Sequence, residues 1–119
     1  MFETVLLPMD ANPQALDTAV KALELVQGHD SCLVLLELLD LAPDPSLLDR
    51  IKARIDQSGV PCQRLERGGE PLTVILDVAD ELNVDVIVMG TGGVSLNSDD
   101  GSTAAHVIEL APCPVLVVP

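Results

Sequence analysis

Residues 32–39 read CLVLLELL, and this stretch decides the fold of the 119-residue chain. Its apolar side chains occupy successive positions rather than alternate ones, which is typical of a parallel strand that is covered on both faces. Helical patterns flank it on both sides. Apolar residues recur at helical spacing over 16–26, and a second helix opens at Asp44 and Pro45, a capping residue followed by proline in the first turn. A strand between two helices predicts a parallel sheet with helices packed against it.

The alternation of strand and helix extends along the whole chain. We expect strands at residues 4–9, 32–39, 60–67, 84–89 and 114–118. We expect helices to begin at Asn12-Pro13, Asp44-Pro45, Pro71 and Ser102, with Gly28 and Gly59 ending the first two. Five strands and four helices predict an α/β fold with one domain, residues 1–119, built on a doubly wound, parallel, five-stranded sheet.

The composition excludes several classes of partner. Six basic and nineteen acidic side chains give a formal net charge of −13, which repels nucleic acids and anionic lipid surfaces. One Phe and no Trp or Tyr leave nothing on which unpaired bases could stack. No apolar run approaches the roughly 18–20 residues of a membrane span, and the first residues do not resemble a signal peptide. We therefore expect a cytoplasmic protein with reduced cysteines that binds neither nucleic acid nor membrane.

The last strand predicts a partner subunit. It carries no charge, and one proline follows it, so nothing downstream would cover it at the edge of a sheet. An apolar edge aggregates unless another chain pairs with it. The third strand, in contrast, is protected by its charged side chains. We therefore expect a symmetric homodimer that pairs along Val115, Leu116, Val117 and Val118.

A glycine-bearing loop carries the most distinctive chemistry. It runs from Met89 to Thr103, leaving a buried strand and entering a helix. Ligands of open α/β sheets bind outside the carboxyl ends of the strands, where glycines and a helix N-terminus suit phosphate. The loop is not a Walker A motif, which needs Gly-Lys-Ser/Thr. The candidate phosphate-binding residues are Gly90, Gly93, Gly101, Ser102 and Thr103.

Catalytic groups are hard to find in the sequence. Neither histidine has a serine or cysteine at a spacing that indicates a triad. His106 is expected on the outer side of its helix, opposite a core face formed by Ala104, Val107, Ile108 and Ala111. We therefore expect no enzyme activity beyond, at most, negligible ATP hydrolysis.

An ordered set of motifs resembles the universal stress protein family over nearly the whole chain. The first strand runs into Pro8-Met9-Asp10, and Gly69-Glu70-Pro71 precedes the third helix. Residues 85–90 read DVIVMG, 101–107 begin with Gly-Ser and end with Val, and 112–118 read PCPVLVV. The chain is identified from these motifs as a small, single-domain member of the family.

The resemblance implies a fold and a ligand. The fold is adenine nucleotide alpha hydrolase-like, with the strands in the order 3-2-1-4-5 and dimerisation through the last strand. The ligand is ATP or AMP with Mg²⁺, in a protein with a role in the stress response. Asp10 matches the acidic residue near the phosphates, which often acts through a metal ion, and Leu38 lies where backbone groups meet adenine. The full set of implied binding residues is Asp10, Leu38, Met89, Gly90, Gly93, Gly101, Ser102 and Thr103.

Two departures from the family pattern keep a second interpretation open. Seven residues separate Gly93 from Gly101 where the family has nine. Asp99 and Asp100 lie in the loop where many ATP-binding members carry a basic residue. Carboxylates near a triphosphate oppose binding unless a divalent cation intervenes. The alternative is a nucleotide-free universal stress protein that acts as a protein-interaction module, with Asp10 shaping a turn and the glycines serving as turn residues.

Overall fold

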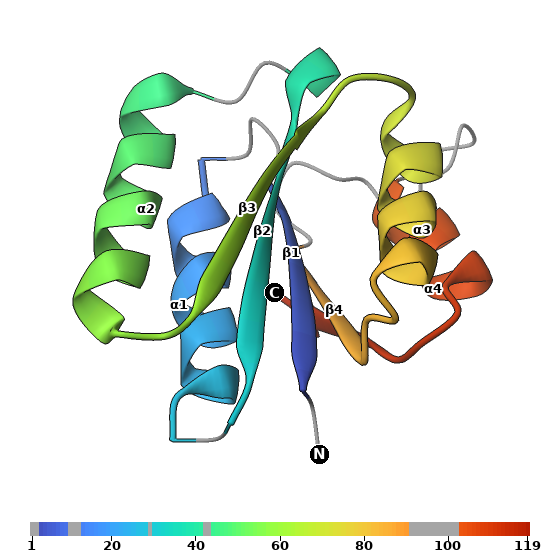
Figure 1. Ribbon diagram of the computed structural model, residues 1–119. Coiled ribbons are helices and arrows are strands. Elements are labelled where there is room, and N and C mark those ends of the chain that lie inside the picture. The colour runs from blue at the N-terminus through green and yellow to red at the C-terminus, as the bar shows by residue number, and fades with distance from the viewer. Residues whose placement is uncertain (1–2, 10–12, 29, 42–43, 91–102) are drawn as a thin grey trace.

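The computed structural model describes residues 3–9, 13–28, 30–41, 44–90 and 103–119. Its centre is one sheet of five parallel strands in the order β3-β2-β1-β4-β5, which confirms the expected fold (Figure 1). The strands are β1 (Thr4–Met9), β2 (Cys32–Leu38), β3 (Cys62–Arg67), β4 (Val86–Gly90) and β5 (Val115–Val118).

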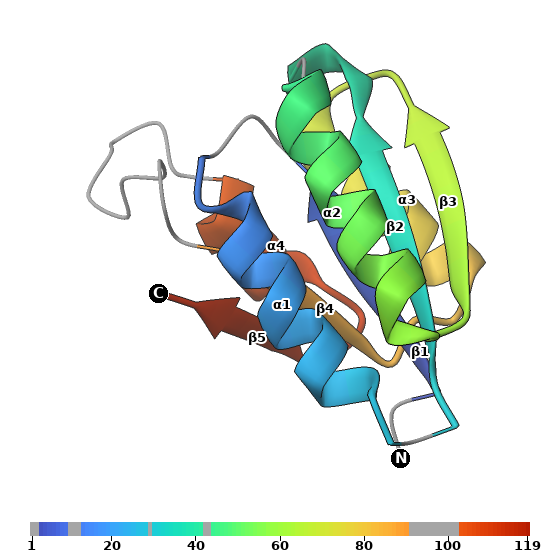
Figure 2. The same cartoon turned by 90° about the vertical axis from the view of Figure 1, so that its left-hand side faces the viewer.

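Helices cover both faces of this sheet. They are α1 (Ala15–Val26), α2 (Pro45–Ser58), α3 (Pro71–Glu81) and α4 (Thr103–Leu110), with a 3-10 turn at Leu39–Leu41. The helices α1 and α2 lie side by side on one face, and α3 and α4 lie on the other (Figures 1 and 2). Every described helix is too short or too polar to cross a membrane.

Two apolar cores follow from the period of two along each strand. Val5, Leu33 and Val88 point toward α1 and α2, and Leu6, Val34 and Ile87 point toward α3 and α4. Because β1 pairs with β2 on one side and with β4 on the other, it is central, and its residues Val5, Leu6 and Leu7 are fully buried. The uncharged sequence of β1 and the almost uncharged sequence of β2 fit strands that are covered on both faces.

Local capping signals position α2 and α3 as expected. The Asp44 carboxylate accepts a hydrogen bond from Ser46 N, Pro45 occupies the first turn, and Gly59 ends the helix in the left-handed region at φ 73°. Pro71 begins α3, where the side chain of Glu70 is the N-cap. These ends were predictable because the residues that fix them are adjacent in sequence.

Several expected boundaries were wrong. The helix α1 begins at Ala15 after Gln14, which makes no side-chain cap; Pro13 precedes it in a turn, and Asn12 lies outside the described residues. Leu39 belongs to the 3-10 turn rather than to β2. The strands β3, β4 and β5 each begin one or two residues later than expected, and β4 extends to Gly90. Helix and strand ends are the features that local sequence fixes least.

The core face of α4 was also predicted incorrectly. Val107 is fully buried and Ala111 packs against the same core, as expected. Ile108, however, is 51% exposed, because it lies on the flank of a short helix rather than over the sheet. His106 is half-buried rather than on the outer surface.

Candidate functional site

The candidate site lies where the strand order reverses. The chain builds outward from β1 through β2 and β3 on one side and through β4 and β5 on the other. The helices that follow β1 and β4, α1 and α4, lie on opposite faces of the sheet (Figures 1 and 2), an arrangement that opens a crevice at the carboxyl edge in doubly wound folds. The described residues at this edge are the ends of β1, β2 and β4 and the start of α4.

Three of the predicted site residues meet at this edge. Leu38 is the last residue of β2 and is 3% exposed, in the core toward α3 and α4. Met89 packs against the same core, and Gly90 ends β4 beside Val118 of β5. Leu38 and Met89 thus place apolar side chains on the face of the sheet that α3 and α4 cover.

The predicted phosphate-binding residues are described only in part. Thr103 is the first residue of α4, so its backbone lies at the amino end of that helix. Asp10, Gly93, Gly101 and Ser102 lie outside the described residues. The structure therefore describes the residues for which the resemblance implies contact with a base, whereas most of those implied to contact phosphate or metal lie outside the described ranges.

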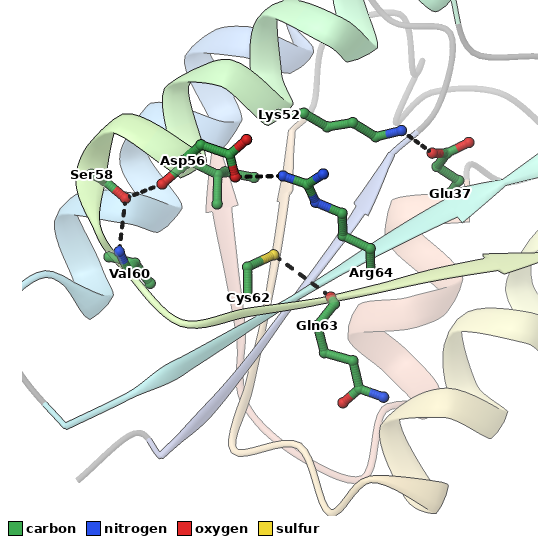
Figure 3. Close-up of polar contacts among 9 residues, drawn as sticks. Glu37, Lys52, Asp56, Ser58, Val60, Cys62, Gln63 and Arg64 are labelled. Atoms are coloured by element: carbon green, nitrogen blue, oxygen red, sulfur yellow. Dashed lines mark hydrogen bonds and ion pairs between the residues drawn. The ribbon is translucent and has the colours of Figure 1, made fainter.

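An ion pair fixes the same edge on the opposite face. Glu37 stands beside Met9 in register, and its carboxylate oxygen lies 2.9 Å from Lys52 Nζ of α2 (Figure 3). The Glu37 side chain is 12% exposed and that of Lys52 is 27% exposed. Glu37 also stands beside Glu66 of β3 in register. The ammonium of Lys52 therefore offsets two neighbouring carboxylates next to the end of β1.

A second carboxylate ties the end of β2 to the loop before α3. Asp40 Oδ2 accepts a hydrogen bond of 3.1 Å from Gly69 N, across 29 residues of sequence. Gly69 has φ 118°, a conformation that L side chains rarely adopt, so glycine is required there. This contact holds the segment that follows Leu38 against the β3–α3 connection.

The amino end of α3 is occupied by its own cap. The Glu70 carboxylate accepts hydrogen bonds from Leu72 N at 3.3 Å and from Thr73 N at 2.9 Å, and the Thr73 hydroxyl donates a third at 2.6 Å. The bond from the Thr73 hydroxyl contributes most to holding the pKa of Glu70 below its ordinary value, and the positive charge of His106 contributes less. The backbone N–H groups of Leu72 and Thr73 are therefore engaged by Glu70, so this helix end offers no free donors to an anion.

The described residues at this edge include apolar side chains but no group of metal ligands. Apolar Leu38 and Met89 suit a flat, uncharged ring, and the nearby Glu37 is neutralised by Lys52. Within the described ranges, no group of three or more His, Cys, Asp or Glu side chains could hold a metal ion. The expected metal ligand, Asp10, lies beyond those ranges.

The cysteines offer no activated nucleophile. Burial raises the pKa of the Cys62 thiol and also that of the Cys113 thiol. A raised pKa lowers the fraction of thiolate, which is the reactive form. All three cysteines are free, as the sequence predicted.

Sequence reasoning missed the contacts that shape this edge. A single glutamate inside the apolar run 32–39 is a signal for a buried ion pair, since an unpaired charge there would be costly. Asp40 directly after a strand and the pair Gly68-Gly69 before Glu70-Pro71 were also visible signals. None of them names its partner, because the partners are distant in sequence.

A groove lies at the β5 edge, where the sequence predicts a partner subunit. It holds about 410 Å³ and is lined mainly by apolar side chains of α1 and β5, among them Leu25 and Leu116. The Leu116 side chain is 42% exposed, and β5 pairs with β4 alone in the described sheet. The groove is continuous with the unpaired edge of β5.

Comparison with known proteins places these features in a family. The model of the universal stress protein family matches residues 1–119. Universal stress protein Sll1654 of Synechocystis is 38% identical over 136 residues, which cover 100% of this chain and 87% of the relative.

Two solved structures share the fold. A crystal structure of a universal stress protein in complex with cAMP aligns with a TM-score of 0.82 at 20% identity, over 99% of this chain and 97% of that one. A universal stress protein family protein from Arabidopsis thaliana with AMP bound aligns with a TM-score of 0.74 at 19% identity, over 98% and 90% of the two chains.

Proposed function

The chain belongs to the universal stress protein family, and from this premise we propose that it is an adenine-nucleotide binding module with a regulatory role in the stress response. In this proposal residues 1–119 act as one domain in the cytoplasm. The observation that supports it is that Leu38 and Met89, at the carboxyl ends of β2 and β4 on either side of β1, belong to the same apolar core, while Gly90 ends β4. Two proteins of the same fold hold cAMP and AMP.

The roles divide between the two ends of the nucleotide. Backbone groups at Leu38 border adenine, and Met89 packs beneath it. The loop glycines Gly90, Gly93 and Gly101 admit phosphate to backbone N–H groups, with hydroxyls from Ser102 and Thr103. Asp10 anchors Mg²⁺, which screens the phosphates from Asp99 and Asp100.

The proposal does not include catalysis. The two described cysteines with shifted pKa values are poor nucleophiles, and the described part of the site presents no histidine paired with a serine or cysteine. A nucleotide that is bound and not turned over can report its own concentration, because occupancy then follows binding equilibrium. We propose that ATP or AMP is such a ligand.

The second subunit completes the proposal. An isologous dimer that pairs β5 of one protomer with β5 of its partner would cover Leu116 and the 410 Å³ groove beside α1. The strand residues at this interface are Val115, Leu116, Val117 and Val118.

Calorimetric titration with ATP and Mg²⁺ tests nucleotide binding. We expect a dissociation constant on the order of 100 µM or tighter, abolished or weakened about tenfold in Asp10→Asn. The matched control is Asp17→Asn, which makes the same change of charge on the exposed side of α1. No heat at roughly 100 µM protein would retire the proposal, and equal weakening by the two variants would remove Asp10 from the site.

A nucleotide-free protein-interaction module is the second candidate function. The acidic sequence at Asp99 and Asp100 and the two residues missing from the glycine loop favour it. Purified protein distinguishes the two candidates, because a chain without Trp or Tyr absorbs little at 280 nm. A maximum near 260 nm in the acid-released fraction supports bound nucleotide, and its absence after purification with Mg²⁺ supports the second candidate.

A further inference from the structure

Two arginines stand without ionic partners in a chain with a large excess of acid. Six basic side chains face nineteen acidic ones. Four of the six form ion pairs: Lys21 with Glu24, Lys52 with Glu37, Arg64 with Asp56 and Arg67 with Glu81. Arg50 and Arg54 are exposed and pair with none of the residues that the structure describes. Both lie on α2, four residues apart, and therefore project from one side of that helix.

A groove runs beside these arginines. It holds about 330 Å³ between α1 and α2, which lie next to each other on the outer surface (Figure 2). Its apolar floor is narrow, formed by Val20 and by Leu23, which is 5% exposed; Arg54 of α2 lines the groove, and Arg50 lies one turn away outside the lining. The remaining lining is polar: Glu24, Gln27, Gln57 and Ser58.

Some of the polar groups along the groove already have partners within the chain. Glu24 is held by Lys21 at 3.4 Å on the outer side of α1. Ser58 is engaged as well, since its hydroxyl donates to Ile55 O at 2.6 Å and accepts from Val60 N at 3.2 Å (Figure 3). Arg54 in the lining and Arg50 one turn away on α2 are therefore the cationic groups at this groove that form no ion pair with the described residues.

We propose that this α1–α2 groove docks an acidic amphipathic helix of a partner protein. A helix lying along two parallel helices places its apolar stripe on Val20 and Leu23. Two of its acidic side chains, four residues apart, then match the spacing of Arg50 and Arg54, since residues i and i+4 lie about 5–6 Å apart on any α-helix. Planar guanidinium groups bind carboxylates with two hydrogen bonds each.

The negative charge of the whole chain restricts where an acidic helix can bind. A net charge of −13 repels an acidic helix over most of the surface, so favourable contacts are confined to the arginine pair. The site lies on the α1–α2 face, whereas Leu38 and Met89 line the opposite face of the sheet. The proposal therefore stands independently of nucleotide binding.

Fluorescence anisotropy with a labelled synthetic peptide tests the proposal. The probe is a helix of about 18 residues with a leucine stripe and glutamates four residues apart beside it, long enough to be helical. We expect saturable binding that is about fivefold weaker in Arg54→Gln and at least tenfold weaker in the double variant R50Q/R54Q. Both side chains are exposed, so the circular dichroism melts of these variants should match the wild type.

Matched controls separate a site from general electrostatics. Arg67→Gln removes the same charge on β3, where Arg67 pairs with Glu81 of α3 on the other face of the sheet, and should leave binding within about twofold. A peptide with lysines in place of the glutamates should not bind. In ¹⁵N spectra the shifted amides should lie in 20–27 and 50–58. Absence of saturation, equal loss in R67Q and R54Q, or shifts confined to other elements would each overturn the proposal.

Discussion

The two edges of one sheet solve the same problem in opposite ways. Both β3 and β5 pair with a neighbour on one side only. On β3 the side chains of Gln63, Arg64, Glu66 and Arg67 are exposed. The strand β5 consists of Val115–Val118, without a charge, and Leu116 is 42% exposed.

The two edge strands differ in whether the chain itself protects them from pairing with another chain. Arg64 is held by Asp56 of α2 at 2.6 Å (Figure 3). Arg67 lies 3.8 Å from Glu81 of α3, so β3 forms ion pairs with helices on both faces of the sheet. Charged side chains keep an edge strand from pairing with other chains. The apolar edge of β5, with its groove of about 410 Å³, lacks this protection, and a second copy covers it in the dimer that we propose.

The largest expected effect is the loss of the dimer in Leu116→Arg. A buried interface anchor contributes about 2 kcal/mol, and an isologous interface contains two copies of it. The dimer dissociation constant should therefore rise by about three orders of magnitude, equivalent to about 4 kcal/mol. Sedimentation equilibrium measures this as a change from dimer to monomer mass.

The matched control for this change lies on the other edge. Gln63→Arg places the same side chain at an exposed position of β3 and should leave the dimer unchanged. If the wild-type protein is monomeric at micromolar concentration, the contrast between the edges has no functional meaning. A monomer produced by Q63R would show that the chains pair through β3 instead.

The next effect concerns the ion pair on which the β3 side of the sheet depends. Lys52→Met leaves Glu37 in a site where its side chain is 12% exposed, next to Glu66. An unpaired, largely buried carboxylate should reduce the free energy of unfolding by about 2 kcal/mol, as measured by urea denaturation.

The double variant E37L/K52M sharpens this test. Replacing both partners of a buried pair with apolar residues is often neutral, because the desolvation penalty disappears together with the attraction. We expect it to be more stable than K52M. If the double variant is less stable than K52M, the Glu37 side chain stabilises the fold even without its lysine partner, and the desolvation argument is wrong.

Sequence predicted the fold well because the deciding signals are local. The run 32–39, the cap at Asp44 and the glycine at Gly59 each indicate an element from a few adjacent residues. The start of α1 was wrong because Gln14 carries no capping bond, which leaves the start of that helix without a local signal.

The candidate site was predictable only in part, for the same reason. Met89 and Gly90 belong to a motif that is contiguous in sequence, and Leu38 was placed by the family resemblance; their role in binding stays a prediction. The contacts that hold this edge join Glu37 to Lys52 and Asp40 to Gly69, and the second pair is 29 residues apart. Pairings of that kind depend on how α2 and the β3–α3 connection pack, which a single sequence does not fix.

The smallest expected effect is a pH dependence at the loop that follows β3. Because the folded-state pKa of Glu70 lies below its ordinary value of 4.5, its carboxylate stabilises the fold above that pH, and the stabilisation disappears as pH falls through the folded-state pKa. Glu70→Ala should therefore melt below the wild type at pH 7, and the two melting temperatures should converge below about pH 4. The loss should be smaller than that of K52M, since Glu70 is exposed and water replaces its bonds to Leu72 N and Thr73 N. Asp77→Asn, on the exposed side of the same helix, is the charge control. A difference between wild type and E70A that persists unchanged at pH 3 would show that the side chain acts through packing. The charge of the cap would then not stabilise the connection that follows β3.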